Sequence, residues 1–440
     1  MGSVMDQRVI NAAPERRGAL PTSRDVRASM DGCTKCGICL AHCPVAAVTG
    51  SFPGPKYTGP QAERFRAIAG VTETAPDLCS GCGVCTSVCP NGVAITDIIA
   101  LAKAEQVAGA GGPGNGQKLL NRPDLIGRLG AVAPWLANRI LATPALRTVA
   151  ERLFGIDRSA PLPRMAGRKF RRWLDMQTQP EGPRLTYFSG CAVEYFDPEV
   201  GIAAVSLLNR LGYRVEVPSE ACCSLPMLSS GEWEPARERA ESLVAELAPS
   251  ARATGVTVGT STSCTLTLRS KYAAYLDMAE GDAAAVSATV TDISTFLLDH
   301  CGDRLARSFA QSPRHVFYHG PCQLRGHGVG QPAVELLQCI PGLRLELSRA
   351  SCCGVAGTYG YQQAKRAIAT QVGEGLMEQI RQSRPELVLC DSETCRWNIE
   401  AQTGVRSVHP VQFYLEALGQ AEIAARSPGM SYKCGPMASE

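Results

Sequence analysis

The spacing of hydrophobic and polar positions changes along the chain and divides it into segments. From about residue 184, short runs rich in β-branched and aromatic residues alternate with longer stretches of helical periodicity. This pattern is typical of βαβ units with parallel strands. Residues 1–28 are polar and predict a flexible tail, whereas 101–180 predict helices interrupted by the Gly-rich sequence AGAGGPGNG at 108–116.

The α/β part of the chain repeats itself. LTYFSGC resembles HVFYHGPC, RVEVPSEACC resembles RLELSRASCC, and VTVGTSTSC resembles LVLCDSETC, with matched cysteines 130 or 131 residues apart. Self-similarity at a fixed spacing indicates repeated structural units. We therefore predict a first module at 181–275 and a second at 311–420, joined by a helical connector at 276–310 and followed by a tail at 421–440.

Composition narrows the class of protein. The chain has 440 residues, 45% of them hydrophobic, which is enough for several cores. Its net charge of +3 gives no case for nucleic-acid binding, and no uncharged apolar run approaches the roughly 20 residues that span a bilayer. The first 30 residues lack the apolar core of an export signal. We therefore expect a reducing cytoplasm, where 20 cysteines are more typical of metal ligands than of disulfides.

Eight of these cysteines form two groups within 29–100. Each group follows the pattern Cys-x2-Cys-x2-Cys-x3-Cys-Pro, in which the fourth cysteine ligates the cluster of the other group. Zinc knuckles, the alternative, usually draw pairs of ligands from separated hairpins without this proline. We predict a helical ferredoxin-like domain with two [4Fe–4S] clusters. One cluster would be held by Cys33, Cys36, Cys39 and Cys89, and the other by Cys79, Cys82, Cys85 and Cys43.

Each module contributes one cysteine after its first strand, a doublet after the second and one after the third. Parallel strands gather their carboxyl ends at one edge of a sheet, so each set is expected to converge there. A four-thiolate metal site uses the whole set, whereas small core residues or a catalytic dithiol are the alternatives. The first quartet is Cys191, Cys222, Cys223 and Cys264, and the second is Cys322, Cys352, Cys353 and Cys395.

Several longer motifs carry a family resemblance. Cys352-Cys353-Gly354 resembles the cysteine-rich CCG domain found in the B-subunit of heterodisulfide reductase and its relatives. PGPKYTGPQAERFR, CCGVAGTYGY, DSETCRWNIE and STSCTLTLR are similar to the C-subunit family of anaerobic glycerol-3-phosphate dehydrogenases, and the likeness runs from about Asp31 to Leu418. The glycolate oxidase iron–sulfur subunit and the lactate-utilisation proteins share the architecture but fewer of these motifs.

The resemblance implies an electron-transfer subunit with no catalytic residue of its own. It implies an FAD-containing catalytic subunit as partner and is compatible with a second flavoprotein subunit. It also implies that the electron acceptor is membrane quinone and that the chain lies at the cytoplasmic side of the inner membrane. It also implies one or two further iron–sulfur clusters in the modules, with zinc in one of them as an alternative. The functional alternatives are the iron–sulfur subunit of a glycolate or lactate dehydrogenase complex and a heterodisulfide-reductase-like thiol–disulfide enzyme.

The chain departs from the heterodisulfide reductase pattern at three serines. Ser261 and Ser392 stand where related domains have a fifth cysteine, and Ser224 follows the first doublet in place of glycine. These serines put a five-thiolate noncubane cluster in doubt. Cys390 lies two residues before Ser392 and would share its face on a strand, which makes it a candidate substitute.

Two further features suggest roles around the metal sites. His42 and His319 lie near predicted ligand cysteines, where a histidine either tunes a cluster or relays protons to a quinone, or is simply structural. Residues 118–176 contain twelve Lys or Arg against four Asp or Glu, interleaved with apolar stretches. We predict amphipathic helices there that make a peripheral membrane contact, with Trp135 and Trp173 as interfacial anchors. Packing between the domains, or against the catalytic partner, is the alternative.

Overall fold

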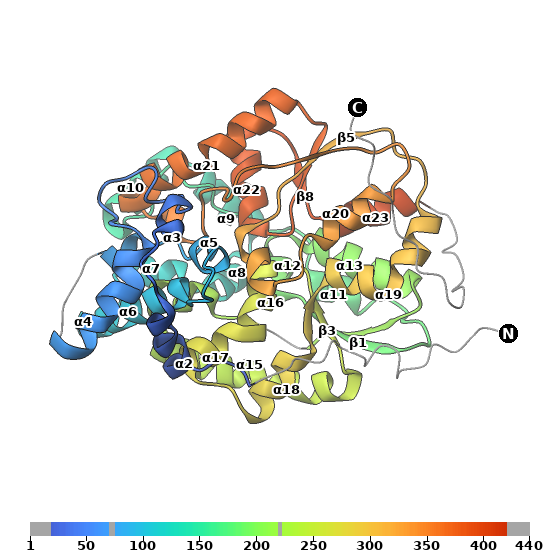
Figure 1. Cartoon of the computed structure of the whole chain (residues 1–440). Helices are drawn as coiled ribbons and strands as arrows, with labels where there is room; N and C mark the ends of the chain where they lie inside the picture. Colours follow the sequence, from blue (N-terminus) through green and yellow to red (C-terminus); the bar gives the residue numbers. More distant parts are fainter. Residues whose placement is uncertain (1–18, 70–74, 219–221, 420–440) are drawn as a thin grey trace.

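The computed structural model describes residues 19–69, 75–218 and 222–419 (Figure 1). Most of the tail predicted at 1–28, and all of the tail predicted at 421–440, lie outside these ranges. In Figure 1 the N-terminal domain (blue) lies on the left, and the strands of the two modules lie on the right.

The N-terminal domain is helical, as its cysteine spacing predicts. Gly37 and Gly83 occupy equivalent places in the two cysteine groups and precede α3 and α5 with φ of 89° and 78°. This left-handed conformation is readily available to glycine and turns the chain sharply around the cysteines. The helices are α2 (Ser23–Ala28), η1 (Ser29–Gly32), α3 (Ile38–Ala41), η2 (Tyr57–Gln61), α4 (Ala62–Ala69), η3 (Ala75–Leu78), α5 (Val84–Ser87) and α6 (Ile95–Gly109).

The segment at 101–180, called the linker below, continues after α6 as a series of short helices. Three of them begin with proline at the first turn, where its missing N–H costs nothing. The helices are α7 (Asn115–Leu120), α8 (Pro123–Gly130), α9 (Pro134–Ala142), α10 (Pro144–Phe154) and α11 (Phe170–Leu174). Trp173 of α11 is buried and stacks with Phe170, so its prediction as an interfacial anchor is wrong: the apolar ring packs into the first module's core.

Each module contains a four-stranded parallel sheet, which confirms the predicted α/β repeat. The strand orders are β2-β1-β3-β4 and β6-β5-β7-β8, so corresponding strands occupy the same positions. The segment 276–310, expected to be a helical connector, contributes a strand to the first sheet between two helices. The strands are β1 (Arg184–Phe188), β2 (Arg214–Glu216), β3 (Thr257–Gly259), β4 (Val290–Asp292), β5 (His315–Tyr318), β6 (Arg344–Leu347), β7 (Leu387–Leu389) and β8 (Ser407–Val408).

The helices of the modules follow their strands. In and after the first module they are α12 (Gly190–Tyr195), α13 (Pro198–Arg210), α14 (Leu225–Ser230), α15 (Trp233–Thr254), α16 (Thr262–Leu266), η4 (Thr267–Lys271), α17 (Tyr272–Leu276), α18 (Gly281–Thr289) and α19 (Ile293–Ser308). In the second they are η5 (Cys322–His327), α20 (Pro332–Gln338), η6 (Tyr359–Tyr361), α21 (Gln363–Ser383), α22 (Glu393–Thr403) and α23 (Pro410–Leu418).

The two modules share one hydrophobic core. Tyr187 and Val258 of the first sheet belong to the same buried cluster as Val316, Tyr318 and Leu389 of the second. Helix α13 packs on α23, and α19 packs on α20, across this junction. Shared apolar burial of this kind holds the modules in a fixed relation and so fixes where their cysteine edges meet.

Candidate metal centres

The structure brings the eight N-terminal cysteines together as two groups that exchange their fourth members. Burial raises the pKa of the Cys39 thiol, and the nearby thiols of Cys33, Cys36 and Cys89 raise it further. In the second group, burial raises the pKa of the Cys85 thiol, with contributions from the neighbouring thiols Cys79, Cys82 and Cys43. The neighbours in space are therefore the sets expected from crossed ligation.

Hydrogen-bond donors surround the second of these groups. The backbone N–H of Ala46 donates to Cys43 Sγ at 3.4 Å, and that of Gly81 donates to Cys79 Sγ at 3.5 Å. The hydroxyl of Thr96 lies 3.1 Å from Cys85 Sγ. Donors of this kind stabilise negative charge on sulfur, which is the form in which cysteine binds metal.

The first quartet gathers at the carboxyl edge of its sheet. Cys191 lies at the start of α12, directly after β1, and Cys264 lies in α16, directly after β3. The sulfur atoms of Cys223 and Cys264 are 3.1 Å apart. Cys222 and Cys191 interact through their side chains, and this contact lowers the pKa of Cys222.

The second quartet has the same arrangement. The sulfur atoms of Cys353 and Cys395 are 3.0 Å apart. The side chains of Cys322 and Cys353 interact with Cys352 and hold its pKa well below the usual range, against the effect of burial. The backbone N–H of Gly354 also donates to Cys352 Sγ at 3.3 Å. In both modules, then, the first thiol of the doublet is the one whose thiolate is stabilised.

The serines that replace a fifth cysteine start helices instead. Ser261 caps α16, where its hydroxyl accepts a hydrogen bond from the Cys264 N–H at 3.4 Å, and Ser392 occupies the N-cap of α22. Serine is a preferred N-cap residue, and each helix carries the last cysteine of its quartet. Cys390 is fully buried, and its side chain contacts Cys395 and raises that thiol's pKa, so it lies next to the second quartet.

The second N-terminal group lies directly against the second quartet. Cys82 shares a buried cluster with Cys322 and Cys352, and burial together with Cys352 raises the pKa of Cys82 to about 12. Gln323, which follows Cys322, donates to the carbonyl of Gly81 at 3.1 Å. The N-terminal domain and the second module thus meet through their cysteine loops.

Further polar contacts fix this junction. Lys365 of α21 forms an ion pair with Asp77 at 2.6 Å, and Lys103 of α6 approaches the same carboxylate at 3.5 Å. The hydroxyl of Tyr359 donates to the carbonyl of Leu78 at 3.1 Å. The lysine side chains are only 4% and 9% exposed, whereas that of Asp77 is 52% exposed, so these contacts orient the two domains without forming a fully buried ion pair.

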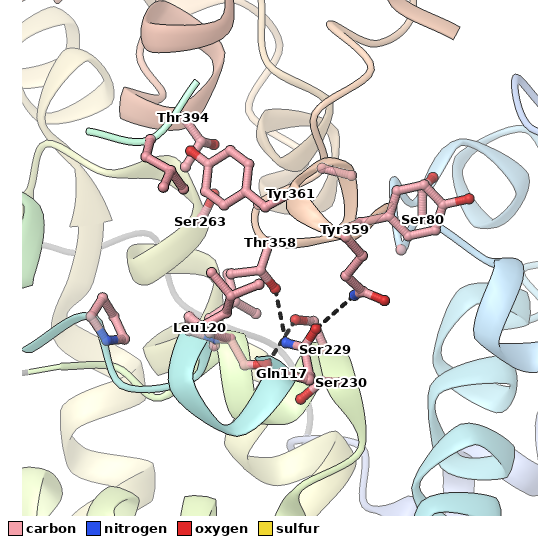
Figure 2. A pocket seen from close by; sticks show the side chains of 18 of the residues that line it. Ser80, Gln117, Leu120, Ser229, Ser230, Ser263, Thr358, Tyr359, Tyr361 and Thr394 are labelled. Carbon is pink, nitrogen blue, oxygen red and sulfur yellow. Dashed lines mark hydrogen bonds between the residues drawn. The ribbon is translucent and has the colours of Figure 1, made fainter. Parts of the chain in front are cut away.

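A cavity of about 740 Å³ lies between the modules, the linker helices and the N-terminal domain. Most of its lining is apolar, and Figure 2 shows part of it, with Gln117 of α7 hydrogen-bonded to Thr358 at 3.1 Å. Seven quartet cysteines reach its wall: Cys191, Cys222, Cys223, Cys264, Cys322, Cys353 and Cys395. The carboxyl edges of both sheets therefore open onto one space.

The donor sets suit iron–sulfur chemistry. All four side chains of each set are thiols, the ligands that hold clusters of this kind. Within the described ranges, no three Cys, His, Asp or Glu side chains are arranged like the ligands of a single metal ion. Around each cluster the chain's own residues would supply the thiolates and the N–H donors named above.

The two candidate histidines differ in their surroundings. His319 is fully buried, its Nδ1 lies 3.2 Å from the Ser348 hydroxyl, and burial lowers its pKa to about 4. His42 is exposed at the end of α3.

One residue of the cavity that the sequence did not single out is Tyr361, which belongs to the CCGVAGTYGY motif but carries no periodic or spacing signal of its own.

Comparison with known proteins supports these centres. A family model described as a 4Fe-4S dicluster domain matches residues 29–93, and one described as a cysteine-rich domain matches 185–269 and 316–400. The chain thus carries a dicluster domain with two [4Fe–4S] clusters, and its two cysteine-rich domains indicate further iron–sulfur clusters.

Three relatives extend the likeness to whole proteins. The C-subunit of anaerobic glycerol-3-phosphate dehydrogenase from Escherichia coli K12 is 33% identical over 396 residues, which cover 89% of this chain and 99% of the relative. The B-subunit of fumarate reductase (CoM/CoB) from Methanothermobacter marburgensis is 28% identical over 84% of this chain and 67% of its own length. Lactate utilization protein A of an Exiguobacterium species is 27% identical over 52% of this chain and 94% of its own. The chain is an iron–sulfur electron-transfer subunit of an oxidoreductase complex, and it belongs to the C-subunit family of anaerobic glycerol-3-phosphate dehydrogenases.

Proposed function

We propose that this chain carries electrons to a membrane quinone. The electrons come from a flavin-bearing subunit that oxidises glycerol 3-phosphate. The observation that carries the proposal is the contact between Cys82 of the N-terminal domain and Cys322 and Cys352 of the second module. A relay needs its centres to be close, and this contact joins two ligand sets without intervening structure. The glycerol 3-phosphate assignment is supported by the relative that covers nearly the whole chain.

The arrangement gives the relay a direction. Cys36 is exposed, so the set of Cys33, Cys36, Cys39 and Cys89 lies nearest to a docking partner. The set of Cys79, Cys82, Cys85 and Cys43 lies behind it and touches the second module. Oxidation of one substrate molecule releases two electrons at the flavin, and one quinone takes up those two electrons together with two protons from water. The chain itself holds no substrate in this scheme.

The experiment is substrate-dependent reduction of the clusters in the complex that co-purifies with this chain. Glycerol 3-phosphate, glycolate and lactate would each be added anaerobically, and the reduced clusters followed by EPR. We expect reduction by glycerol 3-phosphate alone. Reduction by lactate or glycolate, but not by glycerol 3-phosphate, would contradict the substrate assignment and still support electron transfer through this chain. Reduction of a disulfide by the isolated chain would favour a thiol–disulfide enzyme instead.

The linker helices supply the proposed membrane contact. No helix in the described ranges is long and apolar enough to cross a bilayer. Residues 119–154, which lie in α7 to α10 and the turns between them, nevertheless expose a concentration of large apolar side chains, with Val132 84% and Trp135 73% exposed. The others are Leu119, Leu125, Leu129, Leu136, Ile140, Leu146, Val149, Leu153 and Phe154. Exposed apolar side chains concentrated in one segment, called the apolar patch below, indicate an interaction surface.

The charges around this patch favour an anionic lipid surface as its partner. Arg128, Arg139 and Arg152 are exposed on the same helices, whereas Asp124 and Glu151 are held in ion pairs with residues of the protein. Basic side chains beside exposed apolar ones are typical of helices that lie at a membrane interface.

Vesicle flotation tests this contact. Replacing Leu129, Val132 and Trp135 together by serine should abolish binding of the purified chain to vesicles with anionic headgroups, because the inserted apolar area is lost. A matched control replaces the exposed Leu347 of the second module by serine and should bind normally. Binding that is unchanged in the triple variant would assign the patch to a protein partner instead.

A further inference from the structure

The cavity between the modules reaches the proposed membrane surface. Ile140, Leu146 and Phe154 line the cavity and are also 43–47% exposed. They lie on α9 and α10 and belong to the apolar patch described above. Ile126 and Leu141, which are less exposed, also belong to the apolar wall. An elongated apolar molecule therefore has a continuous path from the patch into the cavity.

The opposite end of the cavity is polar and lies beside the quartets. Ser263 and Thr394 line it and directly precede Cys264 and Cys395 in the chain. In Figure 2 the hydroxyl of Tyr361 points toward these two residues. This placement puts Tyr361 close to both modules' last ligand cysteines.

The hydroxyl of Tyr361 can donate a hydrogen bond at this end of the cavity. The residue is 5% exposed, and its hydroxyl has no hydrogen-bond partner among the described residues. A buried hydroxyl without a partner costs free energy, so such groups usually mark a place where another molecule or water binds. Tyr359, two residues earlier, also lines the cavity, but its hydroxyl is already bonded to Leu78.

We propose that this cavity is the quinone site, in which Tyr361 donates a hydrogen bond to a ring carbonyl and the isoprenoid chain leaves between α9 and α10. The inference rests on the proposed function, which supplies the quinone. Clusters held by the quartets would take up the space directly beside the cysteines, and the quinone is assigned to the rest of the cavity, from Tyr361 to the opening between α9 and α10. A quinone combines a flat ring bearing neutral acceptors with a long apolar chain, which matches one lone donor at the end of an apolar space.

The charge at the polar end favours a neutral ligand. Quartet cysteines line the same end, and cysteine binds metal as the negatively charged thiolate. That charge would oppose a carboxylate or a phosphate placed beside Tyr361, whereas a carbonyl oxygen carries no such penalty. The site is therefore better suited to a quinone than to an acidic metabolite or to a fatty acid.

Equilibrium binding of decylubiquinone to the purified, cluster-loaded chain tests the polar end. Tyr361→Phe keeps the ring and removes the donor, so we expect the dissociation constant to rise by about five- to tenfold, the value of one hydrogen bond. Tyr57→Phe, at an exposed tyrosine that does not line the cavity, is the matched control and should leave the constant unchanged. Equal effects of the two variants, or no effect of Tyr361→Phe, would overturn the role of Tyr361.

A second pair of variants tests occupancy of the cavity. Ala150 and Ala145 both lie on α10, but only Ala150 lines the cavity, while Ala145 is exposed. Ala150→Phe should reduce decylubiquinone binding at least tenfold by filling the space, whereas Ala145→Phe should bind normally. Normal binding in Ala150→Phe would place the quinone elsewhere.

The same variants separate this inference from the proposed function. In the reconstituted complex, ferricyanide accepts electrons without needing the cavity. If wild type and Ala150→Phe reduce ferricyanide equally while only the variant fails with quinone, both proposals stand. If wild type reduces ferricyanide but binds no decylubiquinone, the cavity assignment fails alone. If wild type transfers no electrons from the flavoprotein to either acceptor, the proposed function fails.

Discussion

The two modules share a topology but differ at the residue that follows the cysteine doublet. In the second module this residue is Gly354, with φ of 89°, and an added Cβ would run into the backbone of Ala369 and Gly373. In the first module it is Ser224, which adopts the same left-handed region at φ of 56°. The backbone path is therefore the same in both copies, but only the second copy packs its loop against a helix too closely for any side chain.

The two modules also differ in their contacts with the rest of the chain. The second module's doublet touches the N-terminal domain through Cys82. The first module packs on the N-terminal domain through a broader apolar cluster that includes Cys85 and Cys223. It also meets the linker, where Glu232 accepts hydrogen bonds from Asn121 at 2.7 Å and from Arg122 at 2.9 Å. The second quartet thus has a direct thiol contact with the N-terminal domain, whereas the first quartet meets that domain within an apolar cluster and also borders the linker, so we expect substitutions at equivalent positions to have unequal effects.

The largest expected effect comes from a ligand of the second quartet. Cys353→Ser should lower quinone-linked turnover by more than about 100-fold, because changes even in the outer shell of a metal site cost 10- to 100-fold. Cys223→Ser, its counterpart, should lower turnover less, because only the second quartet has a ligand thiol, Cys352, that acts directly on a thiol of the N-terminal domain, Cys82. Iron content, EPR and turnover measure both, with Cys301→Ser, a buried cysteine outside the quartets, as the control.

Full turnover in Cys353→Ser would refute the metal-site interpretation of the doublet. A larger loss in Cys223→Ser than in Cys353→Ser would reverse the order assigned to the modules. Normal iron content in Cys301→Ser is required before either result is interpreted.

The next largest effect should come from Gly354. Gly354→Ala adds left-handed strain and a backbone clash, and we expect it to reduce the free energy of unfolding by about 3 kcal/mol. Gly357→Ala is the control, because Gly357 has φ of 62° but open space around an added Cβ, so strain alone should cost about 1 kcal/mol. Thermal unfolding of the cluster-loaded chain measures both, and equal losses would show that the close contact at Gly354 contributes nothing.

A smaller effect is expected at the junction between the N-terminal domain and the second module. Lys365→Met removes a buried positive charge next to Cys79, although burial already lowers the pKa of this lysine to about 8. Loss of the charge should lower the reduction potential of the adjacent cluster by at least roughly 40 mV, which corresponds to about 1 kcal/mol for a one-electron couple, because a nearby positive charge stabilises the reduced state. A potentiometric EPR titration measures it, and the exposed Lys118→Met should give no shift.

Much of this comparison could be predicted from the sequence, because the relevant signals are regular spacings of cysteines along the chain. The 130-residue offset predicted which cysteines meet, since equivalent strands end at equivalent places in a repeated topology. The Cys-x2-Cys spacing likewise predicted the N-terminal sets. Strands β4 and β8 have only three and two residues, too few for a periodic pattern to appear in the sequence.

What could not be predicted depends on how the segments dock. Trp173 has the same amphipathic setting as Trp135 in the sequence, yet it is buried because α11 packs against the first module. Nor does any pattern place Tyr361 in a cavity formed by four separate parts of the chain. Such positions follow from long-range packing, for which single-sequence periodicity holds no information.

The smallest effect is predicted where the two modules could be made alike. Ser224→Gly gives the first module the same Cys-Cys-Gly sequence as the second, and we expect it to increase the free energy of unfolding by about 1 kcal/mol. The change relieves left-handed strain and also removes a buried hydroxyl that has no partner among the described residues. Arg384→Gly is the control, because Arg384 is exposed with φ of 49° and so reports the strain alone. If the two variants gain equally in a denaturant titration, the hydroxyl of Ser224 costs nothing; if Ser224→Gly loses iron from the first module, the serine contributes to that site, and the difference between the modules extends to their ligands.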